Sequence, residues 1–165
     1  MPNTPFDAEV EQLEALGLKF MDALKAKEEG RFDDAEAIFR EVLTVEPRLA
    51  EPRLELARVL LDTDRLEDAE VHARQALANL QAGGQWNDDI PEKVLLGLAH
   101  ALLAEILRRL ADEDNLIFGD PAKFRAVVKE SRELFEEAAQ LDPADEYSSY
   151  YAFFMGTPGE KPEDQ

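Results

Sequence analysis

The sequence predicts an all-α protein built from repeated pairs of helices, and three observations support this fold class. First, the segment RFDDAEAIFREVL at residues 31–43 is echoed by RLEDAEVHARQAL at residues 65–77, thirty-four positions later. Second, the apolar residues within each copy are spaced by three and four positions, which is the pattern of an amphipathic helix. Third, each copy follows another helical segment, which ends at Gly30 in the first case and near Asp64 in the second. Each unit is therefore expected to be a helix, a tight turn and a second helix.

A period of about 34 residues with two helices per unit is typical of tetratricopeptide (TPR) repeats. The chain resembles a TPR protein of the small, three-repeat type, and this resemblance implies a right-handed α-solenoid with a C-terminal capping helix. Alanines at the helix crossings let two backbones approach closely, and a large aromatic side chain one turn later fills the space beside them. The matching residues are Ala23, Ala26, Gly30, Ala35, Phe39, Val42 and Pro47 in the first unit, and Leu56, Ala57, Leu60, Ala69 and Ala76 in the second.

Taken in order, the units are expected at about residues 16–49, 50–81 and 91–143, within a single TPR domain that covers residues 1–155. The first helix is expected to run from residue 5 to residue 29, with Gly17 as the position where it can kink. A capping helix is expected at 144–155, because the edge of the last repeat needs a cover. The remaining residues, 156–165, are expected to form a disordered tail.

The third unit is stretched by two insertions. Its end, FEEAAQLDP at residues 135–143, repeats the spacing of FREVLTVEP at residues 39–47. The first insertion, AGGQWNDDIPE, contains a Gly-Gly pair at 83–84 that we interpret as a hinge. The second contains the loop NLIFGD, after which Asp120 is expected to cap a helix that has Pro121 in its first turn.

Two segments carry more apolar surface than one repeat needs. Residues 94–107, VLLGLAHALLAEIL, are apolar almost all round, so this helix must be covered by the flanking repeats or by a second copy of the chain. On the expected capping helix, one face carries four aromatic residues, which either cover the last repeat or await a partner or a second copy. These residues are Tyr147, Tyr150, Tyr151 and Phe154.

Composition excludes several classes of function. The chain carries 37 acidic and 18 basic residues, a formal net charge of −19, which excludes a general affinity for nucleic acid and disfavours an anionic membrane surface. Cysteine is absent, so disulfides and cysteine-ligated zinc are excluded. The N-terminal residues show neither a basic nor an apolar region, and residues 94–107 are too short to span a bilayer. We therefore expect no signal peptide and a cytoplasmic location.

No residue pattern indicates catalysis. His72 and His100 are the two histidines, and we expect the first to be solvated or partly buried and the second to be a core histidine with a backbone or carboxylate partner. Neither the Gly-Gly pair nor the many carboxylates form a recognisable phosphate loop or acid/base couple. The sequence therefore predicts a protein that is not an enzyme and needs no metal and no cofactor.

In TPR proteins the first helix of each unit lines a concave groove that holds an extended or helical peptide. The carboxylate clamp of chaperone-binding relatives is absent, because Phe20 and Leu24 stand where its lysine and asparagine would be and Glu55 replaces its second asparagine. The resemblance places the groove at Phe20, Leu24, Lys27, Glu51, Leu54, Arg58, Leu61, Ala101, Glu105, Arg108 and Arg109. The apolar members of this set form a strip that is either open to a partner or covered from within the chain.

The leading hypothesis for function is a non-catalytic interaction module, similar to an adaptor or co-chaperone, that binds a peptide or amphipathic helix of a partner protein, one with basic residues in view of the acidic surface. Small bacterial secretion chaperones share the three-unit, acidic design, which is analogy at the level of fold. The alternative is a self-associating scaffold that forms a homodimer through residues 94–107 or through the aromatic face. A third reading is that the acidic surface mimics nucleic acid or shields a basic protein.

Overall fold

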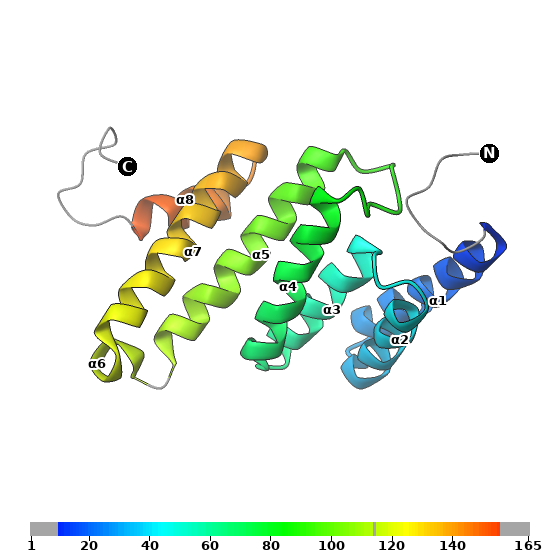
Figure 1. The fold of residues 1–165 in the computed structure, drawn as a ribbon, viewed down its shortest axis with the longest axis horizontal. Coiled ribbons are helices and arrows are strands. Elements are labelled where there is room, and N and C mark those ends of the chain that lie inside the picture. Colours follow the sequence, from blue (N-terminus) through cyan, green and yellow to red (C-terminus); the bar gives the residue numbers. More distant parts are fainter. Residues whose placement is uncertain (1–9, 114, 156–165) are drawn as a thin grey trace. The chain divides into compact units, whose positions relative to one another are not determined.

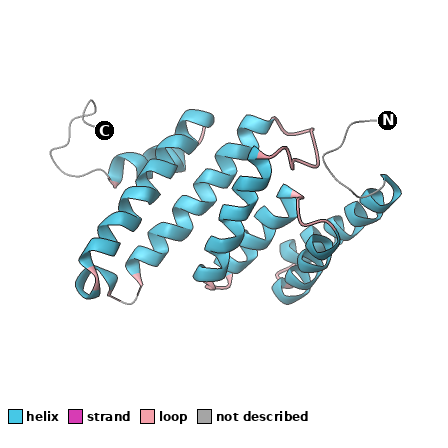
Figure 2. Ribbon diagram, viewed as in Figure 1, coloured by secondary structure: helices cyan, strands magenta, loops and turns pink. Residues whose placement is uncertain are grey.

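The computed structural model describes residues 10–113 and 115–155, and within these ranges the chain forms eight helices and no strand (Figure 2). This confirms the all-α fold class. Contacts within the chain divide it into two compact units, residues 1–92 and residues 93–165. Each unit is described by itself below.

Unit 1 contains two helix pairs that follow one another along the chain (Figure 1). The helices are α1 (Val10–Glu28), α2 (Phe32–Val45), α3 (Ala50–Asp62) and α4 (Leu66–Gln81). Each helix packs against the next one, α1 on α2, α2 on α3 and α3 on α4. The described part of the first helix agrees with the prediction, while the proposed start of that helix lies outside the described residues.

The two copies of the echoed segment begin after the same turn. Gly30 and Asp64 both have a left-handed backbone, with φ of 77° and 61°. In the first turn the Arg31 N–H donates to the Ala26 carbonyl at 2.8 Å, and in the second the Arg65 N–H donates to the Leu60 carbonyl at 2.9 Å. This is the Schellman arrangement, which satisfies the carbonyls left open at a helix C-terminus. The equivalence of Gly30 and Asp64 is thus structural as well as sequential.

The core of unit 1 contains the small residues that the repeat pattern singled out. Ala35 and Ala69, at equivalent positions in the two copies, are fully buried, as is Phe39. The other residues of this core with 0% exposure are Ala23, Ala26, Val42, Leu49, Ala50, Leu56, Ala57, Val59, Leu60, Ala73 and Ala76. Close approach of helices at alanines, with a few large side chains between them, is the packing expected of repeated helix pairs.

The first insertion folds back onto unit 1 as an ordered segment, residues 82–91, which we call the strap. Gly83 has φ of 83° and ends α4 in the same Schellman turn, with the Gly84 N–H donating to the Asn79 carbonyl at 2.7 Å. The Gly84 carbonyl then accepts from the Ala50 N–H at 3.0 Å. Because α3 has no side-chain cap at its start, the strap satisfies an N–H that would otherwise lack a partner.

Unit 2 contains α5 (Glu92–Asp112), α6 (Leu116–Gly119), α7 (Pro121–Leu141) and α8 (Glu146–Phe154). As predicted, Asp120 caps α7, accepting from the Lys123 N–H at 3.1 Å, with Pro121 in the first turn. The segment expected to be only a loop contains one helical turn, α6, because Asn115 takes a left-handed backbone and its carbonyl accepts from the Gly119 N–H. The helix α8 lies where the capping helix was expected.

Contact between α5 and α7 explains two residues of the third repeat. Ser131 stands where repeats usually have alanine; it is fully buried and its hydroxyl donates to the Ala104 carbonyl at 2.7 Å. A Cβ added at Gly97 would lie 3.5 Å from the Leu141 Cβ, so the glycine sits in ordinary contact with α7. His100 meets the expectation of a backbone partner, because its Nδ1 lies 2.7 Å from the Leu96 carbonyl and donates to it.

Candidate functional site

The first candidate site is the side of unit 1 to which α1 and α3 both contribute, named here the α1–α3 face. Phe20, Leu24 and Lys27 of α1 are half-buried, and Lys27 forms an ion pair with Glu55 of α3. Arg58, one turn further along α3, is also half-buried and forms no ion pair with the described residues. The face therefore offers partly accessible apolar side chains on α1 and an unpaired guanidinium on α3.

Two other residues expected on this face are buried. Leu54 and Leu61 of α3 expose 5% and 4% of their surface, so both belong to the core and are closed to a partner in this structure. Burial on more than one side of α3 explains the discrepancy, because six of its other residues are buried as well. A helix covered in this way gives no periodic signal that separates core-facing from groove-facing leucines.

Glu51, another predicted groove residue, binds the strap. Its carboxylate accepts from the Trp86 N–H at 2.8 and 2.9 Å and from the Asn87 N–H at 2.6 Å. A carboxylate that receives two backbone N–H groups from an adjacent loop holds that loop strongly, because the acceptor is charged. Glu51 is therefore occupied within the chain.

Trp86 is the residue of this site that sequence reasoning missed. Its ring centroid lies 5.7 Å from that of Phe20, which in turn lies 5.8 Å from that of Phe39. Trp86 also packs against the small core cluster of Leu16, Val42 and Leu49. The available signal was that the one tryptophan of the chain lies in an insertion rather than in a repeat. The strap thus covers the α1–α3 face at Phe20, whereas Leu24 and Arg58 keep part of their surface accessible.

The second candidate site lies in unit 2, where Glu105 gathers three donors. Arg108 donates to it from Nε at 3.0 Å and from a terminal nitrogen at 2.7 Å, Arg109 donates at 2.9 Å, and the Tyr147 hydroxyl donates at 2.6 Å. Burial alone would raise the pKa of Glu105, but hydrogen bonds from Arg108, Tyr147 and Arg109 outweigh it and lower that pKa. These three predicted groove residues of α5 are therefore joined to each other and to α8.

The aromatic face of α8 divides into an inner and an outer part. Tyr147 and Tyr151 turn inward onto Phe135, with ring centroids 6.0 and 5.3 Å away, and the Arg108 guanidinium lies 4.8 Å from the Tyr151 centroid. Burial and the hydrogen bond to Glu105 raise the pKa of Tyr147. This inner part is a cap of the kind that the last repeat of a solenoid needs.

The outer part of α8 remains accessible. Tyr150 and Phe154 stack on one another with ring centroids 5.6 Å apart and are 57% and 66% exposed, and Phe153 is 88% exposed. By contrast α5 is largely covered, and its most accessible large apolar side chain, Leu98, is 42% exposed. Of the two surfaces considered for self-association, α8 has the larger accessible apolar area.

Neither unit shows a constellation for metal chemistry. Across the described ranges, no group of three or more histidine, cysteine, aspartate or glutamate side chains is arranged to hold a metal ion. In the same part of the chain, no helix combines the length and the apolar character needed to cross a lipid bilayer.

Comparison with known families decides the classification. Residues 26–87, which run from α1 into the strap, match the model of the tetratricopeptide repeat. No curated protein matches the sequence significantly. The chain therefore contains tetratricopeptide repeats.

Solved TPR domains share its fold. The Arabidopsis OM64 TPR domain matches with a TM-score of 0.65 at 14% identity, covering 87% of this chain and 95% of that one. The N-terminal domain of stress-induced protein-1 from C. elegans gives 0.64 at 8% identity, with 90% and 98% covered. The first TPR of Spaghetti (RPAP3), bound to the HSP90 peptide SRMEEVD, gives 0.63 at 12% identity, with 85% and 89% covered. Likeness at these identities establishes the fold, and TPR domains are typically protein–protein interaction modules.

In these TPR repeats, the structure gives a physical reason for the missing carboxylate clamp. Phe20 stands at one clamp position and contacts the Trp86 ring of the strap. Glu55 stands at another and places a negative charge beside Lys27. A peptide C-terminal carboxylate brought to this place would meet a like charge and a cation that is already paired.

Proposed function

We propose that this TPR protein is a non-catalytic interaction module that binds a segment of a partner protein on the open end of the α1–α3 face. The observation that carries the proposal is the Lys27–Glu55 ion pair between α1 and α3, with half-buried Leu24 one turn before Lys27 and half-buried Arg58, which forms no ion pair with the described residues, one turn after Glu55. An apolar anchor flanked by charge of both signs suits an amphipathic helix or an extended peptide of mixed charge.

The acidic surface adds selectivity among such partners. A net charge of −19 attracts a partner with basic residues around the anchoring side chain and speeds its encounter at low salt. We propose an adaptor or co-chaperone-like role on this basis, with the cytoplasm as its place of action. The TPR fold of the solved relatives supports the general role of an interaction module.

Affinity capture from a native lysate, with identification of the bound proteins, tests the proposal. Leu24→Glu and Arg58→Glu should each remove the specific partner from the captured set. Leu18→Glu and Lys25→Glu are matched controls, because both residues are exposed on α1 and lie outside the face. Circular dichroism and thermal unfolding must show that all four variants are folded. A partner retained equally by the face variants and the controls contradicts the proposal.

A second candidate function is self-association, and the exposed ring pair of Tyr150 and Phe154 with the neighbouring Phe153 favours it. An accessible aromatic surface at the end of a repeat array is a recognised site for association. Light scattering over a tenfold dilution series, for the wild-type chain and for Phe153→Ser with Phe154→Ser, tests this candidate. A monomer at every concentration contradicts it.

A further inference from the structure

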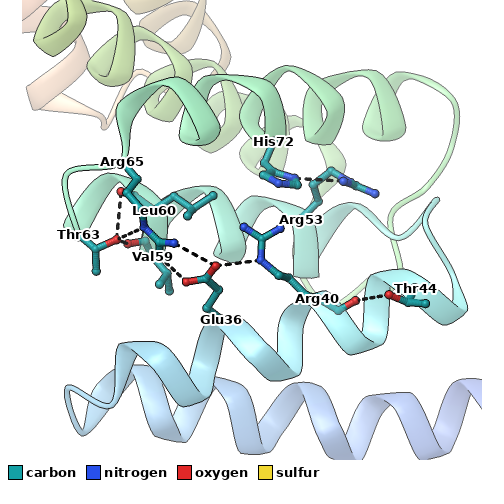
Figure 3. Close-up of polar contacts among 9 residues, drawn as sticks. All are labelled: Glu36, Arg40, Thr44, Arg53, Val59, Leu60, Thr63, Arg65 and His72. Atoms are coloured by element: carbon teal, nitrogen blue, oxygen red, sulfur yellow. Dashed lines mark hydrogen bonds and ion pairs between the residues drawn. The ribbon is translucent and has the colours of Figure 1, made fainter.

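Three basic side chains from α2, α3 and α4 come together in unit 1, apart from the α1–α3 face described above. They are Arg40, Arg53 and His72, and Figure 3 shows the terminal nitrogens of Arg40 turned toward the side of the cluster where the other two lie. Arg53 lies with one terminal nitrogen 3.1 Å from His72 Nδ1 and donates with the other to the Pro47 carbonyl at 3.1 Å. Two guanidinium groups and an imidazole thus form one cluster.

Hydrogen-bond roles fix the state of the imidazole. A guanidinium has donors and no acceptor, so His72 Nδ1 must accept from Arg53. The ring is then neutral and carries its proton on Nε2, which leaves that N–H as a free donor. Burial, together with the charges of Arg53 and Arg40, lowers the pKa of His72, while Asp68 and Glu36 act in the opposite direction. The neutral state is therefore the stable one near pH 7.

The cluster holds more positive than negative charge. Glu36 is shared, because it accepts from Arg40 Nε at 2.9 Å and also pairs with Arg65. Arg53 is half-buried, its Nε is buried without a hydrogen-bond partner, and it forms no ion pair with a described carboxylate. A desolvated guanidinium without an anion is costly, since buried charges are normally paired. The chain has 37 acidic residues, yet no carboxylate among the described residues forms an ion pair with Arg53.

We infer that Arg40, Arg53 and His72 form a binding site for a phosphate group. The unused donors are the two terminal nitrogens of Arg40 and Nε2 of His72, and the half-buried Arg53 guanidinium beside His72 adds its charge, so that three helices contribute to the site. Donors that approach from several directions suit a tetrahedral anion with three free oxygens better than a planar carboxylate. The phosphate is either a phosphorylated side chain of a partner or free inorganic phosphate, since both present the same chemistry.

Histidine NMR gives a direct test, because the chain has two histidines in different units. Inorganic phosphate is titrated into the full-length chain at constant ionic strength and constant pH. The imidazole signals of His72 should shift with saturation, at a dissociation constant on the order of a millimolar because the net charge repels anions. The bound dianion should also raise the pKa of His72, while the signals of His100 serve as the internal reference and stay in place.

Substitutions in the cluster test whether the shift of the His72 signals arises from phosphate bound there. Arg53→Gln and Arg40→Gln should each weaken phosphate binding at least about tenfold, since each removes a positive charge from the site. Arg53→Lys, which keeps the charge without the planar fork, is the second variant that guards against a folding defect. Arg125→Gln is the matched control, because Arg125 is exposed on α7 of the other unit. Circular dichroism of each variant confirms that it is folded.

The outcomes separate clearly. Absence of a saturable shift at His72, an equal shift at His100, or an equal loss in Arg125→Gln overturns the site. Acetate that binds as tightly as phosphate overturns the choice of a tetrahedral anion. A phosphoserine peptide that binds more tightly than inorganic phosphate assigns the site to a phosphorylated partner, whereas equal or weaker binding assigns it to the free ion.

Discussion

Alanine at Gly84 is expected to detach the strap from unit 1. A Cβ at this position would lie 2.3 Å from the Arg48 carbonyl oxygen and 2.8 Å from the Asn79 carbonyl oxygen, closer than such atoms approach. Neither carbonyl oxygen can move away easily, because its backbone is held in place. Asn79 belongs to α4, and its side chain also donates to the Pro47 carbonyl at 3.1 Å and the Leu49 carbonyl at 3.3 Å, which holds the turn that carries Arg48. Release of the strap is the cheaper response.

The destabilisation caused by Gly84→Ala can be estimated from the contacts that the released strap would lose. Two backbone hydrogen bonds of Gly84, to Asn79 and from Ala50, contribute about 1 kcal/mol each in net terms. The two N–H groups bound to the Glu51 carboxylate contribute about 2 kcal/mol, and the partial burial of Trp86 contributes about 1–2 kcal/mol. Conformational freedom regained by the released segment offsets part of this loss. The free energy of unfolding should therefore fall by about 3–4 kcal/mol.

Gly83→Ala is the matched control within the same Gly-Gly pair. Gly83 needs its positive φ of 83°, but a Cβ there has no neighbour within 4 Å. Alanine at this position should cost about 1 kcal/mol, the usual penalty for a left-handed backbone, and leave the strap in place. Urea unfolding followed by circular dichroism measures both losses, and the emission of Trp86, the single tryptophan, reports its surroundings. Wild-type stability with unshifted emission in Gly84→Ala would refute the steric reasoning.

Three further changes in stability can be checked by urea unfolding. Asp64→Gly should raise the free energy of unfolding by about 0.5–1 kcal/mol, because glycine removes the strain of a left-handed aspartate, whereas Asp62→Gly at the last residue of α3 should not raise it. Leu61→Ala should cost about 2–4 kcal/mol as a core residue, and Leu18→Ala, at a 73% exposed position, should change stability by less than about 0.5 kcal/mol. Glu105→Gln should cost about 2–3 kcal/mol at pH 7. Because folding lowers the pKa of Glu105, its stabilisation is complete above the unfolded pKa of about 4.3 and is lost as pH falls further, so the difference from wild type should shrink below about pH 4.

Local patterns predicted the helices well, because their causes are short-range. The spacing of apolar residues fixes which side of a helix is buried, and Gly30 and Asp64 mark equivalent turns although one of them is not glycine. Asp120 and Pro121 correctly placed the start of α7. The fixed period of the repeat then predicted which helices pair, because repeats of equal length stack with the same geometry.

Contacts made by the insertion could not be predicted in the same way. The Glu51–Trp86 contact joins a helix start to an irregular segment 35 positions away, and no periodicity governs such a pair. The burial of Leu54 and Leu61 depends on which helices cover α3, and the Glu105–Tyr147 hydrogen bond depends on where α8 returns. Each of these outcomes follows from tertiary packing, which overrides the pattern of a single helix.

The strap also restricts how a partner can use the α1–α3 face. A ligand that replaced Trp86 against Phe20 would first have to overcome the roughly 3–4 kcal/mol that hold the strap, which corresponds to a loss in affinity of about two to three orders of magnitude. A ligand seated on Leu24 and Arg58 avoids this cost because those side chains are partly accessible already. The expected result is that a partner captured through this face binds without a red shift of Trp86 emission, in a titration of the wild-type chain with a partner segment that lacks tryptophan. A red shift that saturates with binding would show instead that the partner displaces the strap.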